Sequence, residues 1–135
     1  MTPEGAIVAA CLEFLHYAGV VAWRNNSGAV KYKNASGASR FLRYGKVGSA
    51  DIIGWMPDGR FLGVECKTPT GRLSEAQKVW LAELRKAGGV AIVARSVGDL
   101  VDAMAAEGIG VKRLTGPEVI REAGRRDGCE VSALW

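Results

Sequence analysis

Two short runs of β-forming residues joined by a tight turn are the feature that most limits how this chain can fold. The first run ends at Trp55 and the second begins at Phe61. Between them, Pro57-Asp58-Gly59-Arg60 has proline and glycine at positions that β-turns favour. The pattern therefore predicts an antiparallel hairpin.

Charged residues stand at the outer ends of this hairpin. Asp51 opens the first strand, while Glu65 and Lys67 close the second. A hairpin brings its outer strand ends together, and side chains alternate between the two faces of a strand. We therefore expect Asp51 to lie near Glu65 and Lys67 at one edge of a sheet, with Leu62, Val64 and Cys66 on the opposite face.

Such a cluster has more than one interpretation. Charged groups at the ends of apolar strands are costly to desolvate unless something compensates them, and a divalent metal bound by oxygen ligands is one such partner. An ion pair between Glu65 and Lys67, or simple solvation of the strand ends, would also account for the charges. The hairpin alone leaves these alternatives open.

The ordered set of motifs around the hairpin is more specific. Asp51 and Glu65 are separated by thirteen residues, and Lys67 follows two positions later. The flanking motifs are Trp23-Arg24-Asn25-Asn26-Ser27-Gly28, Gly48-Ser49-Ala50, Gly71-Arg72-Leu73-Ser74-Glu75-Ala76-Gln77 and the stretch from Ala87 to Ser96. Over about residues 2 to 105 the chain resembles the PD-(D/E)xK nuclease superfamily and, within it, the VRR-NUC family. Ala50 departs from the pattern, because the superfamily often has proline before its aspartate.

The resemblance implies an α/β fold with a restriction-endonuclease-like core, in which helices flank a mixed central β-sheet. It also implies a Mg²⁺- or Mn²⁺-dependent endonuclease that hydrolyses phosphodiester bonds in DNA. Stand-alone members from phages and bacteria act on branched DNA such as Holliday junctions, and symmetric cutting of a four-way junction needs two sites and hence a homodimer. The catalytic residues implied are Glu4, Asp51, Glu65, Lys67 and Gln77.

The chemistry expected of these residues is metal-assisted hydrolysis. The carboxylates of Glu4, Asp51 and Glu65, with the main-chain carbonyl of Cys66, form an oxygen ligand set that suits Mg²⁺ or Mn²⁺. Lys67 would stabilise negative charge on the phosphate or help to deprotonate the water. The alternatives are a nuclease that nicks or cuts linear duplex with the same site, a non-catalytic nucleic-acid-binding module, and an interaction protein whose charged hairpin edge is structural.

Two of these residues have competing interpretations. Glu4 lies on the apolar stripe of a helix that Thr2 caps and Pro3 begins, so it either complements the helix dipole or, as the resemblance implies, reaches the carboxylate cluster. Ser74 and Gln77 have the spacing of a capping box. We expect this cap and the active-site role to compete for the side-chain amide of Gln77.

The remaining pattern predicts the order α-β-β-β-α-β-α. Helices are expected from Pro3 to near Gly19, from Ser74 to about Ala87 and from Ser96 to about Glu107, with a strand near residues 20–25. The unbroken apolar run at residues 90–94 predicts a strand covered on both faces, and hence a central one. An edge strand at residues 111–114, a short helix at 117–123 and docking of Trp135 on the core or on a second subunit are also expected.

A basic segment lies between Arg24 and Lys46. It contains six cationic residues and no acidic residue, with Tyr32, Phe41 and Tyr44 among them. We interpret it as a loop that offers cations to phosphates and aromatic faces to bases, while a solvated hairpin with aromatic residues packed on the core is the alternative. Arg24, Lys46 and Arg72 are candidates for phosphate contacts.

Length and composition fit a single domain. The 135 residues suffice for one core. We assign residues 1–107 to the nuclease core and residues 108–135 to a C-terminal extension of the same domain. We expect no membrane span, because no apolar run approaches the ~20 residues that one needs, and no secretion, because Met1-Thr2-Pro3-Glu4 is not a basic region followed by an apolar stretch. Its three cysteines lack C-x-x-C spacing, so we expect a protein of the reducing cytosol in a bacterium or a phage-infected cell.

Overall fold

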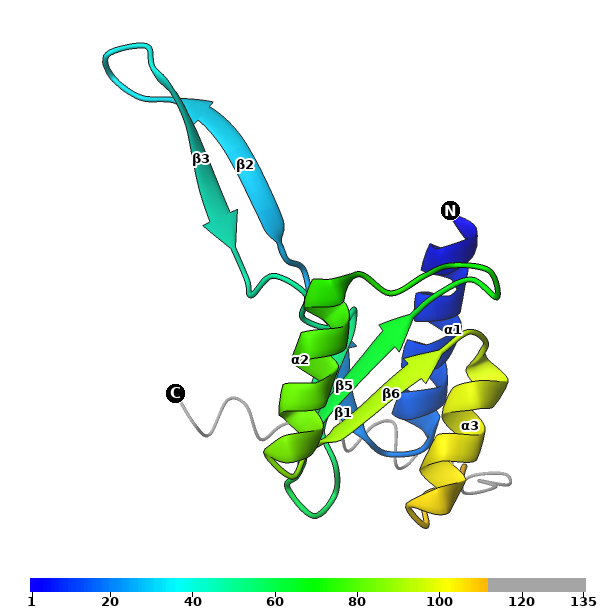
Figure 1. Cartoon of the computed structure of the whole chain (residues 1–135). Helices are drawn as coiled ribbons and strands as arrows, with labels where there is room; N and C mark the ends of the chain where they lie inside the picture. Colours follow the sequence, from blue (N-terminus) through cyan, green and yellow to red (C-terminus); the bar gives the residue numbers. More distant parts are fainter. Residues whose placement is uncertain (112–135) are drawn as a thin grey trace, which may run out of the picture.

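A mixed β-sheet with helices on both faces forms the body of the molecule (Figure 1). In the computed structural model, which describes residues 1–111, the strand order is β1 (Val21–Arg24), β4 (Ile52–Trp55), β5 (Phe61–Cys66) and β6 (Val90–Ala94). Strand β4 is antiparallel to β1 and β5, and β5 is parallel to β6. The fold is thus the expected α/β class with a mixed central sheet flanked by helices.

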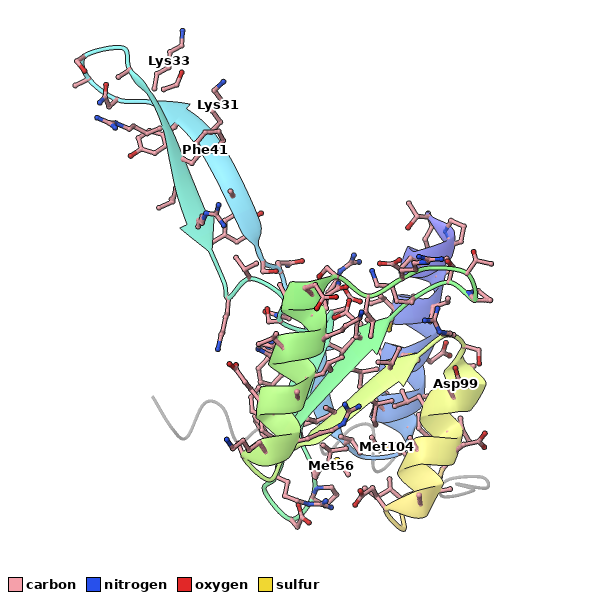
Figure 2. All side chains as sticks on the ribbon, in the orientation of Figure 1. Lys31, Lys33, Phe41, Met56, Asp99 and Met104 are labelled. Carbon is pink, nitrogen blue, oxygen red and sulfur yellow. The ribbon has the colours of Figure 1, made fainter. Side chains whose placement is uncertain are left out.

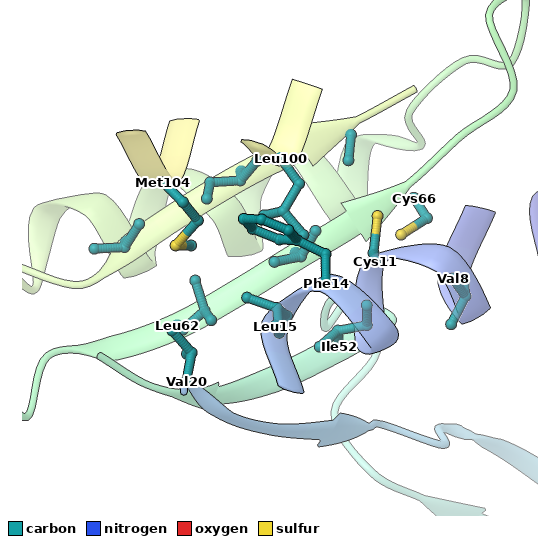
Figure 3. Packing of buried hydrophobic residues seen from close by; sticks show 14 of the residues in the cluster. Val8, Cys11, Phe14, Leu15, Val20, Ile52, Leu62, Cys66, Leu100 and Met104 are labelled. Carbon is teal, nitrogen blue, oxygen red and sulfur yellow. The ribbon is translucent and has the colours of Figure 1, made fainter. Parts of the chain in front are cut away.

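The hydrophobic core lies between the sheet and helices α1 (Pro3–Tyr17) and α3 (Val97–Ala106) (Figure 3). Strand β5 contributes Leu62, Val64 and Cys66 to it, so the predicted alternation along this strand is confirmed. Gly63, on the other face, lies directly under the Trp80 ring of helix α2 (Glu75–Lys86), where a Cβ atom would collide. Helix α2 therefore packs closely on the sheet face opposite the core.

The helix boundaries follow the capping residues in the sequence. Thr2 caps α1, and its side chain accepts a hydrogen bond from the Gly5 amide. Ser74 and Gln77 form both hydrogen bonds of a capping box at the start of α2, and Ser96 caps α3. The three predicted helices are therefore present, with ends within about two residues of the expected ones. None of the helices in residues 1–111 is long and apolar enough to cross a membrane.

The basic segment is not a loop. It forms a separate two-stranded sheet from β2 (Gly28–Lys33) and β3 (Ser39–Tyr44), which stands away from the body (Figure 1). The predicted order α-β-β-β-α-β-α lacks these two strands. The alternative expectation of a solvated hairpin is confirmed, but its aromatic residues do not pack on the core, because 69% of Phe41 is exposed.

Strand β6 corrects a second expectation. It was predicted to be central, but among residues 1–111 it lies at the edge of the sheet, next to β5 alone. Its apolar run reflects helices α2 and α3, which cover its two faces, rather than strands on both sides. The predicted strand at 111–114 and helix at 117–123, and nearly all of the C-terminal extension with Trp135, lie outside the described residues.

Candidate active site

The β4–β5 hairpin brings Asp51 and Glu65 together. Ile52 is paired with Val64, so Asp51 and Glu65 lie just beyond this pair at the open end of the hairpin. At the closed end, the Met56 amide donates a hydrogen bond to the Arg60 carbonyl (2.8 Å). At the open end, Asp51 Oδ2 accepts one from the Cys66 amide (2.9 Å). The backbone thus fixes one carboxylate beside the other.

Glu65 is buried with only part of its hydrogen-bonding capacity used. Only 1% of the residue is exposed, and it is the one buried charged residue among those described. Gln77 Nε2 donates a hydrogen bond to Glu65 Oε1 (2.8 Å), whereas Glu65 Oε2 has no donor within residues 1–111. Buried carboxylate oxygens are normally paired with donors or cations, so this oxygen retains the capacity to accept a hydrogen bond or to bind a cation.

The surroundings of Glu65 favour its protonated form when no cation is bound. Burial, followed by the negative charge of Asp51, raises the pKa of Glu65 to about 8. Lys67 lowers this pKa, and the charge of Glu4 raises it. Two carboxyl groups this close share either a proton or a cation.

Gln77 serves two purposes at once. Its Oε1 accepts a hydrogen bond from the Ser74 amide (2.8 Å), which completes the helix cap, while its Nε2 donates to Glu65. The expected competition for the amide is therefore wrong, because the acceptor end caps the helix and the donor end reaches the site. The capping box fixes the rotamer that presents the amide nitrogen to Glu65.

Asn25 holds the chain just before Asp51, a role that sequence analysis did not assign. Its Nδ2 donates hydrogen bonds to Ser49 Oγ (2.8 Å) and to the Ala50 carbonyl (3.0 Å), and its main-chain amide donates to the Asp51 carbonyl (2.7 Å). The only sequence signal for this role of Asn25 is that the residue lies in one of the motifs that carry the family resemblance.

Arg95 has a comparable role at the loop that follows Lys67. Its Nη1 donates hydrogen bonds to the carbonyls of Thr68 (2.7 Å) and Gly71 (2.6 Å). One guanidinium thus closes the loop that leads to Arg72. The sequence carries no signal for this role either, because the acceptors are main-chain oxygens and any residue type supplies them.

The remaining predicted residues lie at different distances from the centre. Lys67 is half-buried and near enough to lower the pKa of Glu65, and Glu4 is half-buried in the first turn of α1. However, residues 1–111 contain no group of three His, Cys, Asp or Glu side chains that could hold a metal. In this arrangement the charge of Glu4 raises the pKa of Glu65, and a ligand role for Glu4 stays a prediction.

The three candidate phosphate contacts differ from one another. All are exposed. Lys46 forms an ion pair with Glu83 on α2 (3.3 Å). Arg24 is paired with Ile52, which places it on the core face of the sheet, whereas Glu65 faces α2. Arg72 directly follows Gly71, whose carbonyl Arg95 binds. Of the three candidates, it is the nearest in sequence to Lys67.

The family model for the VRR-NUC domain matches residues 2–98, which include the hairpin, Glu4 and Gln77. The chain belongs to the VRR-NUC family. A VRR-NUC domain is a nuclease domain with a restriction-endonuclease-like fold, and the sheet described above is consistent with it. A comparison with curated proteins and another with solved structures each found no match.

The residues of this VRR-NUC site fit the divalent metal on which such nucleases generally depend. The Asp51 and Glu65 carboxylates are hard oxygen ligands held side by side, and Glu65 Oε2 is buried without a donor among the described residues. A cation there would offset both the burial and the repulsion by Asp51 that raise the pKa of Glu65. The main chain of Cys66, which already contacts Asp51, lies at the same position.

Proposed function

We propose that this VRR-NUC domain is a Mg²⁺- or Mn²⁺-dependent endonuclease that hydrolyses phosphodiester bonds in DNA. The observation that carries this proposal is the pair formed by Asp51 and Glu65, in which a fully buried carboxylate has an oxygen without a donor in the described chain. A structural ion pair would leave neither the unpaired oxygen nor the raised pKa of Glu65. A cation-binding site accounts for both.

Each residue of the site then has its own role in the reaction. Asp51, Glu65 and the carbonyl of Cys66 would hold the ion, which when bound supplies Lewis-acid activation of the phosphodiester and of the attacking water. Glu4 adds negative charge that favours the cation. Lys67 places an ammonium beside the carboxylates, where it stabilises charge that develops on the phosphate. Gln77 is a positioning residue for Glu65.

The substrate we propose is branched DNA such as a Holliday junction, cut by a homodimer. One site cuts one strand, so paired cuts in a four-way junction require two copies related by symmetry. Arg24, Lys46 and Arg72 are proposed to contact phosphates. A nuclease that nicks or cuts linear duplex with the same residues is the second candidate.

The free thiols of Cys11 and Cys66 support a reducing compartment. We therefore place the proposed activity in the cytosol of a bacterium or of a phage-infected cell.

The test is cleavage of a labelled four-way junction, a flap and a plain duplex with Mg²⁺, Mn²⁺ or EDTA. We expect metal-dependent cutting by the wild type and by Glu13→Gln, which changes an exposed carboxylate on α1. We expect Asp51→Asn, Glu65→Gln and Lys67→Ala to lose at least about a hundredfold in rate. DNA binding without cutting under every metal would instead identify a non-catalytic binding module.

A further inference from the structure

The β2–β3 hairpin is an arm with no support from the rest of the described chain. Its two strands pair only with each other within residues 1–111, and every residue of both strands is exposed. Figure 2 shows Lys31, Lys33 and Phe41 on this hairpin, away from the body. An isolated two-stranded hairpin is marginally stable in water, so an arm of this kind is expected to have a partner.

The strand register divides the arm into two different faces. Residues paired across an antiparallel ladder project from the same face, and successive pairs alternate. The pairs of Ala29 with Arg43, Lys31 with Phe41 and Lys33 with Ser39 make up one face, which we call the cationic face. The other face carries Val30, Tyr32, Leu42, Tyr44 and one cation, Arg40.

The charge of the cationic face is not compensated by the described chain. Lys31, Lys33 and Arg43 take part in none of the ion pairs found in residues 1–111, whereas Lys46, just beyond the arm, is paired with Glu83. The sequence has no acidic residue from position 14 to position 50. A face of this kind fits a polyanion, and the exposed Phe41 among its cations adds a surface on which a base or sugar can pack.

The base of the arm is fixed to the candidate active site. Asn25, which precedes β2 by three residues, donates hydrogen bonds to Ser49 and Ala50 immediately before Asp51. At the other strand, a Cβ atom on Gly45 would collide with Ser27, so the two ends of the arm are packed against each other. A polyanion that occupies the site would therefore pass the base of the arm.

We propose that the β2–β3 hairpin is a DNA-binding arm whose cationic face contacts phosphates of the duplex that flanks the cleaved bond. The proposal rests on the proposed nuclease function, because that function makes the polyanion DNA. Lys31 and Lys33 each neutralise one phosphate. The arm adds affinity and orientation, and it takes no part in the hydrolysis.

The experiment compares two double variants of the full chain that remove the same charge. Lys31→Gln with Lys33→Gln changes the arm, and Lys78→Gln with Lys86→Gln changes two exposed lysines of α2. Binding to a labelled four-way junction is measured in EDTA over a range of salt concentrations. We expect the arm variant to bind about tenfold more weakly and its slope of log affinity against log salt to fall by about 1.8, because each lost phosphate contact removes about 0.9.

The α2 variant is expected to keep the wild-type slope. An arm variant with wild-type affinity and slope, or an α2 variant that weakens equally, would overturn the proposal. Cleavage with Mg²⁺, measured both below and at saturating DNA, separates the nuclease function from the role of the arm. DNA binding through the arm without any cutting would refute the nuclease function alone, while cutting that does not depend on the arm at any DNA concentration would refute the arm alone.

Discussion

Glu65 shows how one residue couples folding to ligand binding. Its side chain is buried, one oxygen accepts a hydrogen bond from Gln77, and the other has no donor in residues 1–111. The free energy of burying an ionised carboxylate is large, and one amide compensates only part of it. The folded protein without a cation therefore holds a proton at this position, and a cation that replaces the proton also stabilises the fold.

The raised pKa of Glu65 predicts how stability changes with pH. The pKa is about 8 in the folded protein against an ordinary value of 4.5, so between these values the folded state binds a proton that the unfolded state has lost. The contribution of Glu65 to the free energy of unfolding therefore falls as pH rises from 4.5 to 8. In EDTA, we expect the free energy of unfolding of Glu65→Gln to rise relative to that of the wild type over this pH range, by on the order of a few kcal/mol.

Urea unfolding at pH 5 and pH 8.5 measures this difference, and Glu13→Gln is the control for removing a carboxylate from the exposed face of α1. Added Mn²⁺ should stabilise the wild type at pH 8.5 and leave Glu65→Gln nearly unchanged. A difference between the two proteins that does not vary with pH would contradict the account of this site.

The two ends of the Gln77 amide can be separated by mutation. Gln77→Glu keeps an acceptor for the Ser74 amide and loses the donor to Glu65, whereas Gln77→Ala loses both. We expect Gln77→Ala to lower the free energy of unfolding by about 1 kcal/mol and Gln77→Glu to lower it less. Both variants should cut DNA at least about tenfold more slowly, as measured at saturating Mg²⁺. Wild-type cleavage by Gln77→Glu would show that Gln77 is only a cap.

At the level of elements, the sequence predicted those parts whose signals are local. The turn at residues 57–60 predicted the β4–β5 hairpin, and capping residues predicted the ends of the helices. The β2–β3 hairpin was only the alternative interpretation of its segment, because it buries no apolar face in the core and its strands lack the pattern of a half-buried strand. The contacts of Arg95 were missed because they join segments far apart in the sequence and end on main-chain oxygens.

The loop that carries Asp51 depends on its close approach to α2. Gly48 has a positive φ of 81°, and a Cβ atom there would collide with the main chain of Ala76 in the first turn of α2. We expect Gly48→Ala to cost about 2 to 4 kcal/mol, the sum of a strained backbone and a displaced loop, and to slow cleavage. The loop shift is expected to move Asp51 away from Glu65.

Gly59→Ala is the matched control for this substitution. Gly59 also has a positive φ, of 92°, but nothing lies within 4 Å of the position of its Cβ. Gly59→Ala should therefore lower the free energy of unfolding only by the cost of the strained backbone, about 1 to 2 kcal/mol, and leave cleavage unchanged. Equal losses in the two variants, measured by urea unfolding and by cleavage rate, would show that contact with Ala76 does not position the loop.

At the scale of the whole molecule, helix α2 covers only part of its face of the sheet. Val21, Trp23 and Trp55 lie on this face, on strands β1 and β4, and each is 46% to 48% exposed. The rings of Trp23 and Trp55 pack edge to face, with 5.7 Å between their centroids. Tryptophan is enriched at the centres of protein interfaces, and a symmetric dimer buries the same patch from both copies. We therefore expect this face to form the interface of the proposed homodimer.

The dimer is tested by placing a charge on this patch. We expect the wild type at micromolar concentration to scatter light as a particle of twice the 14.3 kDa chain mass, and Trp23→Glu with Trp55→Glu to scatter as a monomer, because two copies would bury unpaired carboxylates against each other. Val101→Glu, at an exposed position on α3, is the control and should remain a dimer. On a four-way junction the wild type should cut both strands within one binding event and the monomer only one. A monomeric wild type would leave nicking of single strands as the activity that this site performs.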